Sequence, residues 1–457
     1  SFKARCPSSQ SLPETMASSL RRAALYGSGI SGAALLAAAC HQRTPRRQQD
    51  CQTAAREGTA TRLYEAFRPV LFLIDPERAH LLTLRMAAGW QRLGMLLEPA
   101  WTGTSPLDWL LRPGSPPAQT SGPDLVQNLL GLRFESPVGI AAGFDKNAEL
   151  VPLYRLGMLP GLGFAEVGSV SARPSTGNTR PRLFRIEEDR AVVNRMGLNN
   201  EGAEAVAARL EGFAALGRAA EGAARAPVGV NLAKTHDPAI LGEAAVEDFV
   251  QSFHRLAPLG DFVVLNVSCP NTEEGKTFEE PESLRALLGA VNSARSKAGP
   301  PLLLKLSPPP ETPEGREGLR QLVEIAREQG VDGFVVSNTV GGRDVPLSDA
   351  GSARVQEIGR GGLSGRPLQA RSTAAIKAVY ELTRGEVPIV GVGGVDSAEA
   401  AYEKIRAGAS LVELYSGLVF KGPGLVADIE VGLRRLLSQD GLPTIAAAVG
   451  ADVPAAR

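Results

Sequence analysis

A cluster of amide and thiol side chains stands near the middle of this 457-residue chain, directly after an apolar run. The run is FVVL at 262–265, and the cluster is Asn266-Val-Ser-Cys269-Pro-Asn271-Thr272. Cys269 is a candidate for proton transfer, because a thiol ionises much closer to neutral pH than a hydroxyl group does. Asn266 and Asn271 flank the thiol and could hold a planar, polar substrate. The pattern indicates a catalytic site at the end of a strand.

An alternation of short apolar segments and helical stretches begins at about residue 137. Strands are predicted at 138–142, 164–167, 228–232, 262–266, 302–305, 334–337, 389–391 and 411–414. Helices are predicted at 200–218, 238–257, 281–298, 314–329, 396–406 and 424–437, and a hairpin at 182–194 follows the second strand. Eight such units predict an α/β fold, a (β/α)₈ TIM barrel, with a doubly wound sheet as the alternative.

Function in such a barrel sits at the C-terminal ends of the strands. The residues at those ends are mostly polar or small, and they include two lysines, a residue type that is almost never buried without a partner. In chain order they are Ala141, Ala142, Gly143, Lys146, Ser169, Asn231, Asn266, Lys305, Ser337, Asn338, Thr339, Gly393, Gly394, Tyr415 and Ser416. This ring is hard to explain as packing alone.

Glycines after the last two strands predict a phosphate site, since barrels of this type bind phosphate there on backbone N–H groups. The run GGLSG at 361–365 adds a third glycine-rich loop. One such loop also fits an ordinary turn, but three loops on the late strands favour a cofactor that carries a phosphate. Lys305 would then face the ring of the cofactor, where a lysine stabilises the negative charge of a reduced flavin.

The composition excludes some classes of function. Charge is balanced, with 49 basic and 49 acidic residues, so nothing points to nucleic acid. Residues 1–49 nevertheless carry seven basic side chains against one acidic side chain, a composition typical of a mitochondrial targeting segment. Residues 23–40 carry no charge and form a candidate membrane span, with a cleaved or disordered targeting segment as the alternative.

Two amphipathic helices are predicted ahead of the barrel. The first covers 61–74, and the second follows the dipeptide Asp75-Pro76, with Asp75 as its N-cap. Their apolar faces either pack on the barrel or dip into a membrane surface and line a route for a lipid-soluble molecule. His80 is a candidate polar group in that route.

The motifs together resemble the dihydroorotate dehydrogenase family, in its membrane-associated, quinone-dependent class. The resemblance covers residues 62–440 and rests on AAGFDKN at 141–147, GSV at 168–170, NRMGLNN at 194–200, NVSCPNT at 266–272, SNT at 337–339, GGLSG at 361–365, GVGG at 391–394 and LYSG at 414–417. The two helices and the segment DPERAH at 75–80 favour the quinone class over the soluble classes.

The resemblance implies a role for each group of residues. FMN would be bound by Ala141, Ala142, Gly143, Ser169, Asn231, Lys305, Ser337, Ser364, Gly365, Gly393, Gly394, Tyr415 and Ser416. Dihydroorotate or orotate would be bound by Lys146, Asn194, Met196, Gly197, Leu198, Asn266, Asn271, Asn338 and Thr339, with Lys146 on its carboxylate. His80 and Arg185 would line a tunnel for a ubiquinone-type quinone. Cys269 departs from the serine that the quinone class uses as its base.

The resemblance therefore implies that the protein is an enzyme of de novo UMP synthesis, which oxidises (S)-dihydroorotate to orotate. Its predicted parts are a targeting segment, candidate span and linker at 1–60, a helical hairpin for quinone access at 61–110, the FMN barrel at 120–440, and a tail at 441–457. We expect a monomer on the surface of the mitochondrial inner membrane. The alternatives are a soluble-type dihydroorotate or dihydropyrimidine dehydrogenase that uses fumarate or a nicotinamide, and a non-catalytic, flavin-binding membrane-surface protein.

Overall fold

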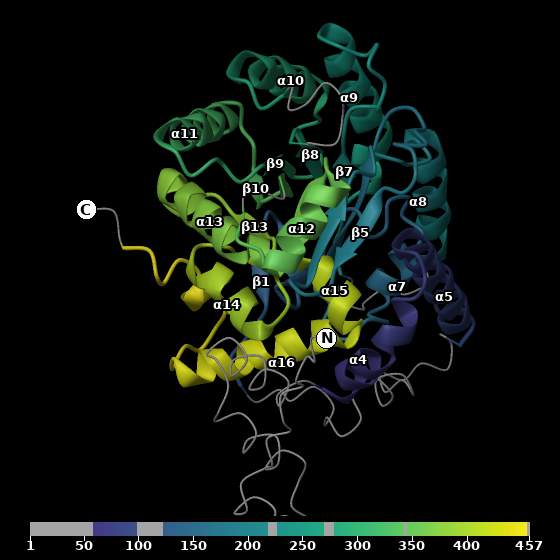
Figure 1. Cartoon of the computed structure of the whole chain (residues 1–457). Helices are drawn as coiled ribbons and strands as arrows, with labels where there is room; N and C mark the ends of the chain where they lie inside the picture. The colour runs from purple at the N-terminus through teal and green to yellow at the C-terminus, as the bar shows by residue number, and fades with distance from the viewer. Residues whose placement is uncertain (1–57, 98–121, 218–225, 269–277, 342–344, 455–457) are drawn as a thin grey trace, which may run out of the picture. The chain divides into compact units, whose positions relative to one another are not determined.

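Eight parallel strands close into a barrel with helices around it (Figure 1). The strands are β3 (Val138–Ile140), β4 (Phe164–Val170), β7 (Val228–Leu232), β8 (Phe262–Asn266), β9 (Leu302–Leu306), β10 (Gly333–Val336), β13 (Ile389–Val392) and β14 (Leu411–Leu414). The computed structural model describes residues 58–97, 122–217, 226–268, 278–341 and 345–454, all within the unit that begins at Gly58. The predicted TIM barrel and its eight strands are confirmed, and the doubly wound sheet is excluded.

The outer helices follow the strands in the predicted alternation. They are α7 (Val151–Arg155), α8 (Ala203–Gly217), α9 (Glu243–Leu256), α10 (Pro281–Ala294), α11 (Pro313–Glu328), α13 (Gln369–Thr383), α14 (Ala398–Arg406), α15 (Ser416–Lys421) and α16 (Gly424–Gln439). Several begin where the sequence supplies a cap, as at Thr312, whose hydroxyl accepts from the N–H of Gly315 at 3.1 Å. Their apolar faces pack on the sheet and form the main core.

A layer of large apolar side chains fills the N-terminal half of the barrel interior. Phe164, Phe262 and Leu411 belong to it, and Phe134 joins them from the hairpin of β1 (Gln127–Leu129) and β2 (Leu132–Phe134). The Phe134 and Phe164 rings meet edge to face at 5.6 Å. A Cβ on Gly139 would lie 2.4 Å from the Phe164 ring, so this position has no room for a side chain. The barrel is therefore closed at this end, and only its C-terminal end can hold a site.

A second, four-stranded sheet stands beside the C-terminal end of the barrel. The predicted hairpin is confirmed as β5 (Leu183–Ile186) and β6 (Ala191–Asn194). The sequence did not indicate that β12 (Gly362–Gly365) pairs with β6 and extends the sheet. Nor did it indicate that β11 (Val340–Gly341) pairs with the other edge of β12. With α12 (Asp349–Ile358), these strands enclose a small apolar core of their own.

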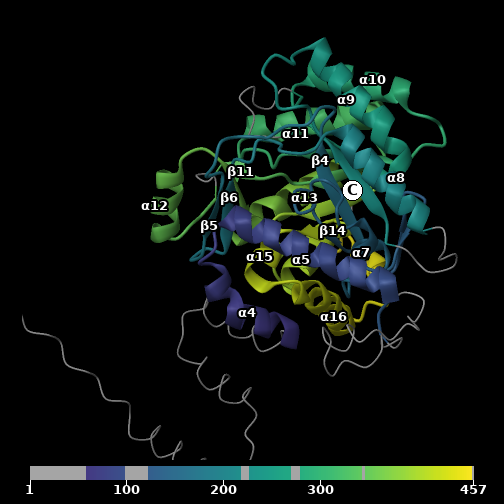
Figure 2. The same cartoon turned by 90° about the vertical axis from the view of Figure 1, so that its right-hand side faces the viewer.

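The two predicted N-terminal helices are α4 (Thr59–Leu71) and α5 (Pro76–Leu97). Asp75 caps α5 as expected, because its carboxylate accepts from the N–H of Arg78 at 3.0 Å. Helix α4 packs beside α15 and α16, and the Tyr64 hydroxyl donates to the carbonyl of Val419 at 2.8 Å. Helix α5 lies along α7 and β5, as Figure 2 shows.

Both helices also turn large apolar side chains to solvent. Leu63, Phe67 and Val70 on α4 and Met86 on α5 are more than half exposed, and Leu73 between the helices is 85% exposed. The helices therefore only partly bury their apolar faces on the barrel. None of the described helices is long and apolar enough to cross a membrane. The candidate span at 23–40 lies outside the described residues.

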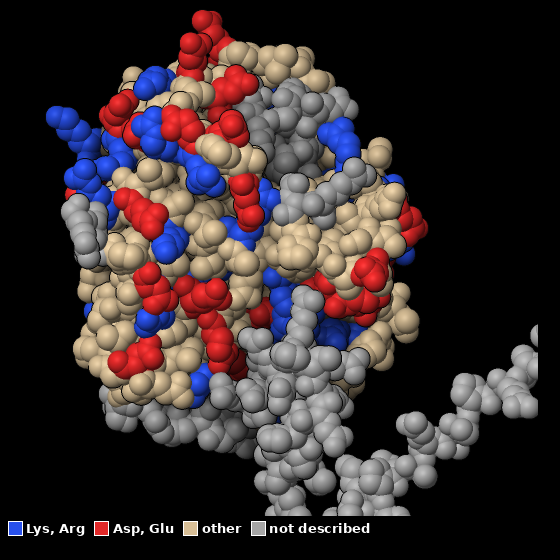
Figure 3. Space-filling view, turned by 60° about the vertical axis from the view of Figure 1, so that its left-hand side comes forward, with Lys and Arg blue, Asp and Glu red and all other residues tan. Residues whose placement is uncertain are grey.

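One face of the molecule is mixed in charge. On the face in Figure 3, basic and acidic side chains alternate and do not gather in fields of one sign. The described part of the predicted tail, 441–454, packs onto the barrel unit through Ile445 and Ala448, which are fully buried. This segment is thus part of the folded unit.

Candidate functional site

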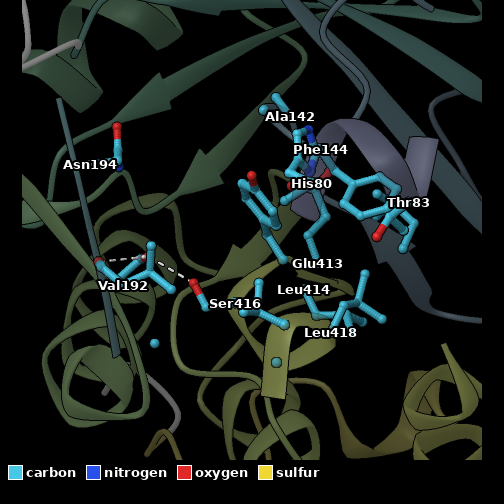
Figure 4. Close-up of a pocket in the computed structure, with 18 of the residues that line it drawn as sticks. His80, Thr83, Ala142, Phe144, Val192, Asn194, Glu413, Leu414, Ser416 and Leu418 are labelled. Carbon is cyan, nitrogen blue, oxygen red and sulfur yellow. Dashed lines mark hydrogen bonds between the residues drawn. The ribbon is translucent and has the colours of Figure 1, made fainter. Parts of the chain in front are cut away.

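One cavity of about 750 Å³ reaches from the helices α4 and α5 to the C-terminal ends of the barrel strands (Figure 4). Its lining includes every predicted site residue in the described part of the chain except Asn231, which is fully buried. From the predicted set these are His80, Ala141, Ala142, Gly143, Lys146, Ser169, Arg185, Asn194, Met196, Gly197, Leu198, Asn266, Lys305, Ser337, Asn338, Thr339, Ser364, Gly365, Gly393, Gly394, Tyr415 and Ser416. Cys269 and Asn271 lie outside the described residues, so their roles stay predictions.

A buried polar layer forms the floor of the cavity. The layer consists of Glu166, Lys305 and Glu413. Each stands two residues after a member of the apolar layer on the same strand, so its side chain also points into the barrel, nearer the C-terminal end. The Lys305 ammonium donates to Glu166 Oε1 at 3.1 Å, and the Asn231 amide donates to the same oxygen at 2.7 Å. Burial opposes the charge of Lys305, but the charge of Glu166, which also accepts its hydrogen bond, raises its pKa. Lys305 is therefore a fixed cation below the cavity.

A network of amides and hydroxyls covers one wall at the ends of β8 and β10. Asn266 donates to Ser169 Oγ at 3.1 Å and accepts from the amide of Asn338 at 3.3 Å. Asn338 also donates to Ser268 Oγ at 2.9 Å, and its own oxygen accepts from the N–H of Thr339 at 2.8 Å. These bonds fix the orientation of each amide, so the wall can hold a flat ligand with alternating donors and acceptors.

Lys146 supplies a second cation at the cavity. Its ammonium donates to Asn199 Oδ1 at 2.6 Å, which holds the side chain in place. Gly197 lies nearby in a left-handed conformation with φ of 70°, and a Cβ there would approach Asn178 to 2.7 Å. The segment between β6 and α8 can therefore pass close to Asn178 only with glycine at this position. The cation suits a ligand carboxylate.

The predicted glycine-rich loops meet around two hydroxyl groups. Ser364 Oγ lies 2.7 Å from Ser416 Oγ, and Gly365 and Gly394 next to them have φ of 102° and 74°. A Cβ on Gly394 would lie 2.6 Å from the backbone of Gln369, so the loop after β13 packs directly on the start of α13. Hydroxyl groups beside close-packed glycine backbone fit the terminal phosphate of a cofactor.

Lys404 on α14 lies fully buried behind these loops and did not stand out in the sequence. Its ammonium donates to Ser372 Oγ at 2.9 Å, and Ser372 in turn donates to the carbonyl of Val392, directly before Gly393. Burial lowers the pKa of Lys404 to about 7. The side chain therefore fixes the loop after β13 to the start of α13.

Three aromatic rings lie close together in the lining of the cavity. His80 lies 5.5 Å from Phe144 and 6.1 Å from Tyr415, and Phe144 lies 5.8 Å from Tyr415, as ring centroids (Figure 4 shows His80 and Phe144). Burial, followed by the charge of Lys146, lowers the pKa of His80 to about 4, so its imidazole is neutral at pH 7. Burial raises the pKa of Tyr415 to about 12.

Arg185 on β5 lines the cavity beneath the helices. Its guanidinium donates to the carbonyls of Phe72 and Ile74 at 3.3 and 3.0 Å and lies 4.3 Å over the Phe72 ring. Burial lowers its pKa. The end of α4 is therefore attached to the small sheet at the point where the apolar part of the cavity begins.

Sequence reasoning missed the two acidic residues of the floor, Glu166 and Glu413. Each is the single charged residue of an apolar strand, FAEVGSV and LVEL, and that contrast was the available signal. It also missed Asn199, which holds Lys146, and Ser268, which bridges two amides of the wall. These residues act through others, and only contacts between distant segments reveal them.

Comparison with known proteins places this architecture in a family. The sequence profile of dihydroorotate dehydrogenase matches residues 124–437. The chain is 43% identical to a dihydroorotate dehydrogenase (quinone) of Anaeromyxobacter sp. strain Fw109-5, over 86% of this chain and 99% of the relative. A relative of the same name from Natronomonas pharaonis is 40% identical, over 86% and 99%. A crystal structure of DHODH from Eimeria tenella with ferulenol superposes with a TM-score of 0.69 at 31% identity, over 84% and 99%.

One prediction has to be corrected. The mitochondrial inner membrane is wrong as the expected location, because curated relatives such as those of Anaeromyxobacter, Roseiflexus and Natronomonas pharaonis come from bacteria and an archaeon, which have no mitochondria. The basic composition of residues 1–49 suggested that location, but composition alone does not identify a compartment. Residues 1–57 lie outside the described residues.

Proposed function

The chain belongs to the dihydroorotate dehydrogenase family and oxidises dihydroorotate to orotate with a quinone as electron acceptor, a step of pyrimidine biosynthesis, and we propose FMN as the cofactor that joins the two half-reactions. The observation that carries the proposal is one cavity of about 750 Å³, whose lining includes both Lys146 with the amide wall and apolar residues of α4 and α5. Both half-reactions have room in it.

The residues of the cavity fit FMN. Gly365, Gly394, Ser364 and Ser416 would hold the phosphate, since close backbone and hydroxyl groups suit that anion. Lys305 would face the ring from the floor, where its charge stabilises electron density that arrives on the ring. When bound, FMN supplies the hydride acceptor of the first half-reaction and the electron donor of the second.

Dihydroorotate would lie against the amide wall. The Lys146 ammonium would pair with its carboxylate, while Asn266 and Asn338 would hydrogen-bond the ring amides. Asn194, Met196, Gly197, Leu198 and Thr339, which line the same cavity, and Asn271 would complete the pocket. This arrangement would fix the substrate ring in one orientation, with C6 toward the cofactor and C5 toward the base.

Cys269 is the proposed base that removes the proton from C5. Its neighbour Ser268 is fully buried and accepts from Asn338, so the segment that leads to Cys269 is attached to the amide wall. A thiolate at this position would lie next to the groups that hold the substrate.

The quinone would enter between α4 and α5. Phe67, Leu73 and Met86 expose apolar surface next to this part of the cavity, which fits docking on a membrane surface. Arg185 and the neutral His80 are the polar groups that would meet the quinone head. We propose that the protein does this as a monomer.

Steady-state oxidation of dihydroorotate, with a ubiquinone analogue, fumarate and NAD⁺ as competing acceptors, tests the proposal. Of the three acceptors, we expect only the quinone to support turnover. We also expect the purified protein to be yellow and dihydroorotate to bleach its colour. Turnover with fumarate or NAD⁺ would favour a soluble-type enzyme. A yellow protein that dihydroorotate leaves unbleached would favour a non-catalytic flavoprotein.

A further inference from the structure

Two carboxyl groups in the floor of the cavity leave buried oxygens without a hydrogen-bond partner. Glu413 on β14 is fully buried, and neither of its carboxyl oxygens has a partner among the described residues. Glu166 on β4 is 1% exposed, and its Oε2 is likewise without one, although its Oε1 accepts from both Lys305 and Asn231. Buried polar atoms are rarely left unpaired, so this pair needs an explanation.

The charge balance of the floor explains why these carboxyl oxygens have no partner. Lys305 is the one cation that hydrogen-bonds Glu166 or lowers the pKa of Glu413 among the described residues, so ionisation of both carboxyl groups would leave a net negative charge out of contact with water. Burying an unpaired carboxylate is costly, and a group in that position takes up a proton instead. Burial, followed by the charge of Glu166, raises the pKa of Glu413 well above its usual range, against the opposing effect of Lys305.

A proton on Glu413 also satisfies the unpaired oxygens. A protonated carboxyl group gains an O–H donor, and Glu166, which lies within hydrogen-bond reach of Glu413, offers an oxygen that accepts nothing else. Lys305 and Asn231 both donate to Oε1 of Glu166, so Glu166 already acts as an acceptor on that side. One shared proton therefore gives partners to both side chains.

We propose that Glu413 is a neutral carboxylic acid that donates to Glu166, and that this bond leaves the charge of Lys305 opposed by only one carboxylate. The proposal rests on the proposed position of FMN above Lys305. Glu413 is thus a positioning residue, since it acts on the cofactor through Glu166 and Lys305. With both glutamates ionised, the floor would repel the electrons that the ring receives, and the ring would be harder to reduce.

Infrared spectroscopy of the FMN-loaded protein tests the protonation directly. We expect a carbonyl band of a protonated carboxylic acid at pH 7 that shifts in D₂O and is missing from Glu413→Gln. Labelling the wild type with ¹³C-glutamate assigns the band to a glutamic acid even where the variant accumulates poorly. A difference spectrum without such a band means that Glu413 is ionised, and it overturns the proposal.

The midpoint potential of the bound flavin supplies an independent readout. Glu413→Gln replaces one neutral group by another of the same shape, so we expect the potential of the wild type at pH 7. If Glu413 carried a charge, the same variant would remove a negative charge below the ring, and a raised potential would contradict the proposal. Lys305→Met is the control, and its loss of a cation should lower the potential. Flavin released from denatured protein reports FMN binding separately. A protein that lacks FMN counts against the proposed function, and the same infrared comparison, made on that FMN-free protein, still tests the proton on Glu413.

Discussion

The Arg182 guanidinium donates to the Glu77 carboxylate at 2.7 Å, and both side chains are less than a tenth exposed. Arg180 donates to the same carboxylate at 2.9 Å. Glu77 stands in the first turn of α5, whereas Arg182 directly precedes β5 and also donates to the carbonyls of Thr176 and Asn178. This buried ion pair therefore attaches the start of α5 to the segment that leads into β5.

Glu77→Gln should destabilise the folded unit by about 3 kcal/mol, because it leaves the Arg182 guanidinium buried without a counter-charge. Urea denaturation at pH 7 measures the loss. Glu317→Gln is the matched control, since Glu317 pairs with Arg320 on an exposed face of α11 and should change little. Equal losses of stability in the two variants would show that the buried pair contributes no more to the free energy of unfolding than an exposed pair does.

The stability that Glu77 contributes through its ion pairs should depend on pH. Burial acts to raise the pKa of Glu77, but hydrogen bonds from Arg182 and then Arg180 lower it to about 2, from the ordinary value of 4.5. A carboxyl group whose pKa is lower in the folded state stabilises that state fully above the ordinary value and loses the contribution as pH falls toward 2. The difference between wild type and Glu77→Gln should therefore shrink between pH 4.5 and 2. A difference that stays constant over this range would contradict the assignment.

The sequence predicted the barrel well for a physical reason. Strands such as LLLKL at 302–306 are buried on both faces, and an apolar run between loops with Gly or Asn signals that state locally. The site residues follow those strands directly, so the topology brings Lys305, Asn266 and Asn338 to one cavity. Local patterns were enough here.

The remaining features depend on contacts between distant segments. The pairing of β12 with β6 joins residues about 170 positions apart, and no local pattern indicates it. The same holds for Glu413 and Glu166, which the barrel brings together from β14 and β4. The apolar faces of α4 and α5 were visible in the sequence, but the share that packs on the barrel depends on side chains such as Tyr64, which reaches Val419.

Arg185→Ala should raise the KM for the quinone about tenfold and leave the KM for dihydroorotate almost unchanged. The substitution removes two hydrogen bonds that a charged group makes to the end of α4, and neither of these bonds reaches the amide wall. Steady-state kinetics with each substrate varied in turn measures both constants. Arg133→Ala, on the exposed hairpin at the other end of the barrel, serves as the control. A rise in the dihydroorotate KM of equal size would place Arg185 in the substrate site.

Substitutions of the two lysines of the cavity should affect different steps of the reaction. Lys146→Ala should raise the KM for dihydroorotate about 10- to 100-fold, since a charge-assisted bond to the carboxylate is lost, and should keep its FMN. Lys305→Ala should instead slow the bleaching of the flavin by dihydroorotate, because the cation of the floor is lost. Stopped-flow absorbance and the flavin content of each variant measure the two effects. A Lys146→Ala protein without FMN but with an unchanged dihydroorotate KM would mean that the two roles are reversed.

The last prediction concerns Cys269, which lies outside the described residues. A thiol has an ordinary pKa near 8.5, whereas a serine hydroxyl is a far weaker acid, so only the thiol ionises appreciably near neutral pH. If Cys269 is the base, the rate of flavin bleaching by dihydroorotate should rise with pH through one ionisation and then level off.

Substitutions at this position separate the base from a residue that is only packed. Cys269→Ser should keep some activity, with its rate shifted to higher pH, and Cys269→Ala should lose nearly all of it. A thiol-alkylating reagent should inactivate the wild type, and orotate should protect it. Stopped-flow measurements across pH in the three proteins decide the matter. Bleaching by Cys269→Ala at the wild-type rate, with the same pH profile, would show that another group takes the proton from C5, because a methyl side chain can accept none.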